Sequence, residues 1–129
     1  MNKIIVEVSI GELLDKISIL EIKKEKIKDA EKLKFINNEH YILKNQLEEN
    51  VKSDEKLNNF YQSLKEINSK LWVIEDDKRQ CEKDKDFGEK FIKLSRDVHF
   101  LNDDRAKIKL EINNYTGSVI KEIKEYTSY

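Results

Sequence analysis

Apolar residues recur at steps of three and four along most of the chain, which is the spacing of one face of an α-helix. The clearest run alternates the two steps, as the seam of a coiled coil does. Its positions are Leu57, Phe60, Leu64, Ile67, Leu71, Ile74, Lys78 and Cys81. The alternation resumes at Phe87, Phe91, Leu94, Val98, Leu101, Arg105, Ile108 and Ile112. The pattern therefore predicts a long C-terminal helical hairpin that turns near residues 84–87.

Two shorter helices are predicted before this hairpin. Ser9 and Glu12 have the spacing of a capping box, in which each side chain bonds the other residue's backbone N–H, so a helix begins after Ser9. Its apolar residues cover more than one stripe, and we expect this helix to be buried on two sides. Near Asp29 the apolar register shifts, which predicts a second helix capped by Asp29. Ser53 and Asp86 are the predicted starts of the third and fourth helices.

The segments outside the helices are short. Residues 3–8, KIIVEV, are rich in β-branched residues and alternate weakly, which predicts an N-terminal strand. Gly117 predicts the turn that ends the fourth helix. Short connections make neighbouring helices antiparallel. We therefore expect one all-α domain over residues 1–129, an up-down antiparallel helical bundle with a long C-terminal helical hairpin and a short N-terminal β-like strand.

Charge is abundant but evenly mixed. Charged residues make up 40% of the chain, and 25 basic and 26 acidic residues leave a net charge of −1. No basic stripe is present, which argues against nucleic acid as a partner. A single Cys excludes an intramolecular disulfide and suits a reducing compartment. No apolar run is long enough to predict a membrane span, so we expect a cytoplasmic protein without a membrane partner.

The three arginines are concentrated in the predicted hairpin. Arg79, Arg96 and Arg105 stand in a chain that otherwise uses Lys as its cation. A guanidinium group offers a planar set of donors that fits carboxylates and phosphates better than an ammonium group does. The arginines are therefore candidates for binding an anion.

A polar stripe runs beside each seam of the hairpin. Folding the hairpin about residues 84–87 places Glu75 or Asp76 opposite Arg96. The same folding places Trp72 opposite His99. One interpretation is a partly buried groove with an aromatic floor that binds a small anionic ligand. Its residues would be Trp72, Glu75, Asp76, Arg79, Arg96, His99 and Asp103. The other interpretation, which we favour, is a row of inter-helix ion pairs, because such pairs flank most coiled-coil seams.

The acidic and ligating residues form no complete metal-binding or catalytic motif. Glu12 and Asp15 have the i, i+3 spacing with which all-helical nucleotide pyrophosphohydrolases bind Mg²⁺, but a second pair on a facing helix is missing. His40 and His99 lie far apart in sequence, and a zinc site needs about four N or S ligands. We therefore predict no metal site and no cofactor, and we favour a non-enzymatic role while leaving catalysis open.

The sequence contains, in this order, VSIGELLDKISILEIKKEKI, LWVIEDDKRQCE, FGEKFIKLSRDVHFLNDDRAKIKLEIN and GSVIKEIKEY. With these strings it resembles a small family of bacterial and phage proteins that is catalogued only as a domain of unknown function. The resemblance implies a compact helical domain and supplies no activity or cofactor. It places the family's polar signature on Glu12, Asp15, Lys16, Glu21, Glu75, Asp76, Arg79, Arg96, Asn102, Asp103 and Arg105. The chain departs from the family at Lys78 and at His99, and the second departure argues against a catalytic His99.

Two functions follow from these observations. The favoured hypothesis is a helical interaction or scaffolding module that self-associates, as a dimer first of all, or that binds another protein. The long seams and the broad apolar surface of the first helix support it. The alternative is a domain that binds a small anionic, phosphate-bearing molecule, or a Mg²⁺-dependent enzyme that processes nucleotides. The arginines and the polar stripes of the hairpin support the alternative.

Overall fold

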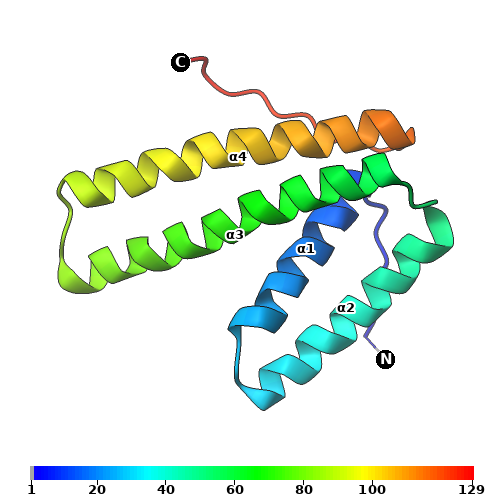
Figure 1. The fold of residues 1–129 in the computed structure, drawn as a ribbon, viewed down its shortest axis with the longest axis horizontal. Helices are drawn as coiled ribbons and strands as arrows, with labels where there is room; N and C mark the ends of the chain where they lie inside the picture. Colours follow the sequence, from blue (N-terminus) through cyan, green and yellow to red (C-terminus); the bar gives the residue numbers. More distant parts are fainter. Residues whose placement is uncertain (1) are drawn as a thin grey trace.

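The computed structural model describes residues 2–129 and contains four α-helices in that range. They are α1 (Ile10–Lys26), α2 (Ala30–Asn50), α3 (Glu55–Asp84) and α4 (Glu89–Thr116). The helices form two antiparallel hairpins, α1–α2 and α3–α4, and the α3–α4 hairpin lies along the long axis of the molecule (Figure 1). The prediction of a helical bundle with a long C-terminal hairpin is confirmed.

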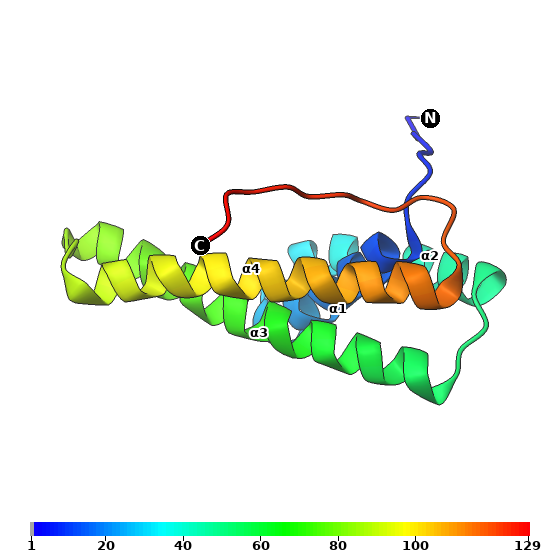
Figure 2. The same cartoon turned by 90° about the horizontal axis from the view of Figure 1, so that it is seen from above.

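The predicted N-terminal strand is wrong. Residues 3–8 form no strand and no helix, and in Figure 2 this segment projects away from the helices. β-branched residues favour extended backbone, but a strand also needs a neighbour that pairs with its N–H and C=O groups. The rest of the described chain is helical or irregular and offers no such neighbour. We call residues 3–8 the N-terminal arm.

The helices begin close to the predicted positions. Ser9 and Asp29 cap α1 and α2 as expected, and each side chain accepts a hydrogen bond of 3.0 Å from the backbone N–H three residues on. The cap of α3 is Asp54, one residue later than predicted. The cap of α4 is Gly88, whose N–H donates to the carboxylate of Asp86 at 3.2 Å. Asp86 therefore shapes the turn and does not cap the helix.

Helix α1 lies at the centre of the fold. It packs against α2, α3 and α4, whereas α2 packs on α1 alone among the described helices. Ile17 and Ile22 are both almost fully buried, and because they are five residues apart they are rotated by about 140° from each other around α1, whereas Lys16 is exposed. The prediction that this helix is buried on two sides is confirmed. Around its first turns the hydrophobic core forms from Leu14, Leu57, Leu64 and Ile112.

The α3–α4 hairpin extends well beyond the helix that supports it. Helix α1 has 17 residues and α3 has 30, which corresponds to about 25 Å and about 45 Å at 1.5 Å per residue. Figure 1 shows the end of the hairpin near residues 85–88 projecting past α1 and α2. One face of the hairpin therefore rests on α1 over only part of its length, and the opposite face has no helix against it.

Candidate functional site

The polar residues predicted to line a groove between α3 and α4 lie on the outside of the hairpin. Trp72 is partly buried, and the other six are exposed, namely Glu75, Asp76, Arg79, Arg96, His99 and Asp103. None of the ion pairs in the described chain joins two of them. The favoured interpretation of these stripes, inter-helix ion pairs, is therefore not what the side chains form. Ligand binding by these residues stays a prediction.

Three of these residues instead contact aromatic rings. The guanidinium of Arg96 lies 5.8 Å from the ring centre of Phe100. The ring of His99 packs on both Phe100 and Tyr129, with centroids 5.1 Å and 4.7 Å away. The hydroxyl of Tyr129 donates a hydrogen bond to Asp103. The C-terminal segment after α4 therefore ends beside Phe100, and Figure 2 shows it running back along α4.

A different set of polar residues is buried where α1 crosses the hairpin. The amide of Asn68 on α3 donates to Oδ1 of Asp15 and to Oγ of Ser18, both at 2.8 Å. The Ser18 hydroxyl donates to the backbone carbonyl of Asp15 at 2.8 Å. Arg105 on α4 donates to Oδ1 of Asn68 at 3.3 Å. With Glu12 and Lys109, described next, these residues form what we call the crossing cluster.

Lys109 provides the positive charge of the crossing cluster. Its ammonium group lies 2.7 Å from Glu12, 3.2 Å from Glu122 and 3.6 Å from Asp15. Burial by itself lowers the pKa of Lys109, but the hydrogen bond to Glu12 and the charge of Asp15 outweigh it, and the pKa is raised. Lys109 is therefore held as an ammonium ion at neutral pH and is neither a base nor a nucleophile there.

Gly11 allows α1 to approach α4 closely enough to build this cluster. A Cβ atom at Gly11 would lie 2.6 Å from the backbone oxygen of Lys109 and 2.9 Å from Oδ1 of Asn113. Instead, the Gly11 N–H donates to Oδ1 of Asn113 at 2.7 Å, and the neighbouring Ile10 N–H donates to Oγ of Ser118 at 3.1 Å. Side chains of the C-terminal half therefore satisfy the free N–H groups at the start of α1. The close contact and the buried charges hold α1 in one position on the hairpin.

A second polar group connects α1, α2 and α3. Glu21 accepts hydrogen bonds from Tyr61 and from Lys65, the latter at 3.3 Å. Burial raises the pKa of Glu21, but these two bonds outweigh it, and the pKa is lowered. His40 lies 3.8 Å from Glu21, and its Nε2 atom is buried without a hydrogen-bond partner. Burial, together with the positive charge of Lys24, lowers the pKa of His40.

Sequence reasoning found only part of these clusters. Glu12 and Asp15 were recognised as an acidic pair, but the Glu12 carboxylate binds Lys109 and does not reach back to the N–H of Ser9 as the capping box predicts. Asn68 and Lys109 were not singled out, since each lies beside an apolar seam position. The sequence of α1 does contain an indication of the cluster, because the polar residues Asp15 and Ser18 lie on a face of the helix that was expected to be buried.

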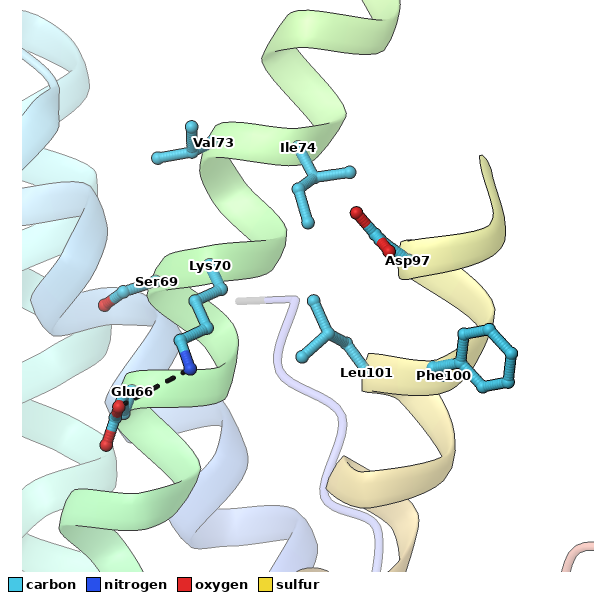
Figure 3. Close-up of a pocket in the computed structure, with 8 residues that line it drawn as sticks. All are labelled: Glu66, Ser69, Lys70, Val73, Ile74, Asp97, Phe100 and Leu101. Carbon is cyan, nitrogen blue, oxygen red and sulfur yellow. Dashed lines mark ion pairs between the residues drawn. The ribbon is translucent and has the colours of Figure 1, made fainter. Parts of the chain in front are cut away.

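A shallow groove lies on the face of the hairpin that points away from α1. Its volume is about 630 Å³, and Figure 3 shows Ile74 and Leu101 between the two helices, with Val73 and Phe100 at the two sides. Charged residues surround this apolar floor, namely Glu66, Lys70 and Asp97. The groove is therefore apolar in the middle and polar at its edge.

The position of the groove follows from helix geometry. Val73 lies five residues after Asn68, which contacts α1, and is therefore rotated by about 140° from it at 100° per residue. Phe100 lies nine residues before Lys109, which also contacts α1, and is rotated by about 180°. We call this side of α3 and α4 the back face of the hairpin.

The described residues give two further findings. No group of three or more His, Cys, Asp or Glu side chains within residues 2–129 is arranged to hold a metal ion. Within the same range, none of the helices combines the length and the apolar character that crossing a membrane requires.

Comparison with known proteins identifies the family. Residues 4–129 match a family model described as "Family of unknown function (DUF6165)", and the chain belongs to this family. No curated protein and no solved structure matches the chain. The predicted resemblance to an uncharacterised family is confirmed. Because the family brings no activity with it, a function has to be argued from the geometry of the chain.

Proposed function

We propose that this member of a family of unknown function is a helical interaction module that self-associates through the back face of its α3–α4 hairpin. The observation that carries the proposal is the apolar groove of about 630 Å³ on a face that no other helix of the described chain covers. Val73 and Phe100 are exposed there, in the middle of two long helices. A contiguous apolar patch with a polar rim is typical of a protein-protein interface.

A second hairpin of the same kind fits this face. Two antiparallel helices with apolar residues on a shared face complete a four-helix bundle when they pack on an equivalent pair. With a length of about 45 Å and a width of about 20 Å for two helices, the back face offers about 900 Å² per copy. A stable interface of standard size buries about 800 Å² per partner. The face is therefore large enough for a dimer.

The charges at the rim favour a second copy over an unrelated partner. Lys70 on α3 and Asp97 on α4 lie on the two sides of the groove. In a two-fold arrangement that places α3 of one copy on α4 of the other, Lys70 of each copy meets Asp97 of its mate, so the pair forms twice. The net charge of −1 adds almost no repulsion between copies.

The proposal is tested by sedimentation equilibrium of the full chain. Val73→Asp places a carboxylate on the back face at one side of the groove, and we expect it to weaken self-association at least tenfold because a buried, unpaired charge is costly in an interface. Phe35→Asp is the control, since Phe35 on α2 is also exposed apolar surface, at 78% against 49% for Val73, but lies elsewhere. It should leave the association unchanged. A wild-type protein that stays monomeric at high concentration, or a Val73→Asp variant that associates as the wild type does, refutes the proposal.

The anionic-ligand hypothesis retains one observation in its favour. Arg96 lines a smaller hollow of about 390 Å³ on α4, together with Ile92 and Phe100. A flat apolar wall next to a guanidinium group suits a ring that carries a phosphate. The test is a thermal-shift screen with nucleotides, polyphosphates and small carboxylates, each with and without Mg²⁺. A ligand that raises the melting temperature of the wild type but not of Arg96→Lys supports this second function, and a panel without any shift opposes it.

A further inference from the structure

The N-terminal arm exposes apolar side chains that the rest of the described chain does not cover. Ile4, Ile5 and Val6 are 89%, 81% and 70% exposed. Their β-branched side chains favour the extended backbone of a strand. No hydrogen bond from the described chain pairs the backbone of these residues. The arm therefore has both the side chains and the free backbone groups that a partner strand would use.

The sequence of the arm is complementary to itself when it is read in the opposite direction. In an antiparallel pair centred on Ile5, Lys3 of one copy lies opposite Glu7 of the other, and this ion pair forms twice. In the same register Ile4 lies opposite Val6 twice, and Ile5 lies opposite its own counterpart. We propose that the arms of two copies pair through residues 3–7 as an antiparallel β-ribbon with a two-fold axis at Ile5.

Other pairings of the same segment lose these contacts. A parallel ribbon in register places Lys3 against Lys3 and Glu7 against Glu7, and like charges that face each other destabilise a ribbon. An antiparallel ribbon centred on Val6 instead of Ile5 places Glu7 opposite Ile5 and breaks both ion pairs. The centred antiparallel register is therefore favoured by charge, and a two-fold axis makes the second copy the partner.

The base of the arm is fixed, and its tip is accessible. Ser9 caps α1, and the adjacent Ile10 N–H is bonded to Ser118, so the arm leaves the helices from a defined point. Figure 2 shows it pointing away from all four helices, which leaves room for a second arm. A two-stranded ribbon of this length is only marginally stable in water. The ribbon is therefore a weak, reversible contact.

This contact is separate from the proposed back-face interface and goes beyond it. Each contact has a two-fold axis of its own, and a chain that carries two such contacts links its copies into assemblies larger than a dimer. Removing one contact should leave dimers held by the other, and removing both should leave monomers. The two proposals can therefore fail independently.

The test exchanges the charges of the arm in full-length protein that carries Val73→Asp, so that only the ribbon is measured. Lys3→Glu and Glu7→Lys each replace two attractive pairs with two repulsive ones, and each should weaken association by about tenfold in sedimentation velocity. The double variant Lys3→Glu/Glu7→Lys restores both ion pairs and should recover the affinity, as should an equimolar mixture of the two single variants. Single variants without effect, or a double variant as weak as the single ones, overturn the ribbon.

A cysteine at the two-fold axis checks the register. In a Cys81→Ala background, Ile5→Cys brings two thiols to about 5 Å between Cβ atoms, and it should form a disulfide-linked dimer at least tenfold faster than Val8→Cys, whose thiols would be about 20 Å apart along the ribbon. Equal rates overturn the proposed register.

The two proposals are separated by single variants of the otherwise wild-type protein. If Glu7→Lys leaves the mass of the assembly unchanged while Val73→Asp alone gives monomers, the ribbon fails and the back-face interface stands. If Val73→Asp has no effect and Glu7→Lys gives monomers, the back-face interface fails and the ribbon stands.

Discussion

Replacing Lys109 with Met should destabilise the protein strongly, because it leaves the buried carboxylate of Asp15 without its cation. Met keeps the length and the apolar stem of Lys but removes the ammonium group, which lies 2.7 Å from Glu12 and 3.6 Å from Asp15. Only 6% of the Asp15 side chain is exposed, so water cannot replace the lost partner. Breaking a buried ion pair from one side costs about 3–5 kcal/mol.

The structure places the expected cost at the lower end of that range. Glu122 is 45% exposed and can be rehydrated when its partner is removed. Asp15 keeps its hydrogen bond from Asn68, and Arg105 remains bonded to the same Asn68. We therefore expect a loss of about 3 kcal/mol in the free energy of unfolding. For 129 residues, an unfolding entropy of ~2.1 cal/mol/K per residue makes this a drop of about 11 °C in the melting temperature.

The assay is urea unfolding followed by circular dichroism at pH 7, with thermal melts alongside. The pKa of Lys109 is raised above its usual 10.5, so the stabilisation is fully present at pH 7 and is lost only as the pH rises through the folded-state pKa. Lys93→Met is the control. Lys93 also lies 2.7 Å from a carboxylate, that of Asp97, but its side chain is 76% exposed. It should shift the melting temperature by no more than about 2 °C.

A second substitution tests the cause of the loss. Asp15→Asn removes the stranded charge and keeps an oxygen for the bond from Asn68, so Lys109→Met/Asp15→Asn should be more stable than Lys109→Met alone. If Lys109→Met costs less than about 1 kcal/mol, the crossing cluster is not a buried ion pair in solution. If the two substitutions are simply additive, the two groups do not interact, and the reasoning is refuted.

Two further perturbations test other contacts of α1 and its neighbours. Gly11→Ala should destabilise by about 1–3 kcal/mol in urea unfolding, because its Cβ would lie 2.6 Å from a backbone oxygen of α4; Gly88→Ala, with 3.5 Å to its nearest atom, should change little. The pKa of His40 is lowered below its usual 6.5 by burial and by Lys24, so its neutral form stabilises above that pH and the stability falls as the pH drops. The melting temperature of His40→Leu should therefore fall less than that of the wild type between pH 7 and pH 5, and an equal fall contradicts the role of His40.

The helices could be predicted from the sequence because their signals are local. The three-four spacing and the capping residues act within a few positions of the chain, and Ser9, Asp29 and Gly117 have the roles expected of them. The N-terminal arm shows the limit of such signals. Its residues have the composition of a strand, but pairing depends on what else the chain brings alongside, and composition carries no information about that.

The seam of α3 was predicted as one continuous stripe, but the structure divides it. Leu57, Leu64 and Leu71 are buried, whereas Ile67 and Ile74 are only partly so. Helix α1 crosses the hairpin at an angle. The side of α3 that it buries therefore contains Leu64 and one residue that does not belong to the seam. That residue is Asn68, and the position of α1 cannot be read from the spacing of α3.

Arg105 and Lys78 occupy seam positions where apolar residues are expected, and the structure gives a different reason for each. The guanidinium of Arg105 bonds Asn68 in the crossing cluster. The ammonium of Lys78, farther along the hairpin, lies 6.0 Å from the ring centre of Phe91. Both cations are held by groups on the facing helix, but only Arg105 lies near α1. The polar residues at seam positions therefore do not mark a single binding site.

The length of α1 explains why the far end of the hairpin keeps exposed apolar residues. A two-helix hairpin is stable only where its apolar residues are covered on a third side. Helix α1 is about 25 Å long and crosses the hairpin at an angle (Figure 1), so it covers only part of a hairpin of about 45 Å. Helix α2 cannot extend the cover, because it packs on α1 and on neither helix of the hairpin. The buried charges of the crossing cluster fix α1 near the open end of the hairpin, and its far half keeps exposed apolar residues such as Ile92 and Phe87. A second copy packed on the back face would cover this half without any rearrangement of α1.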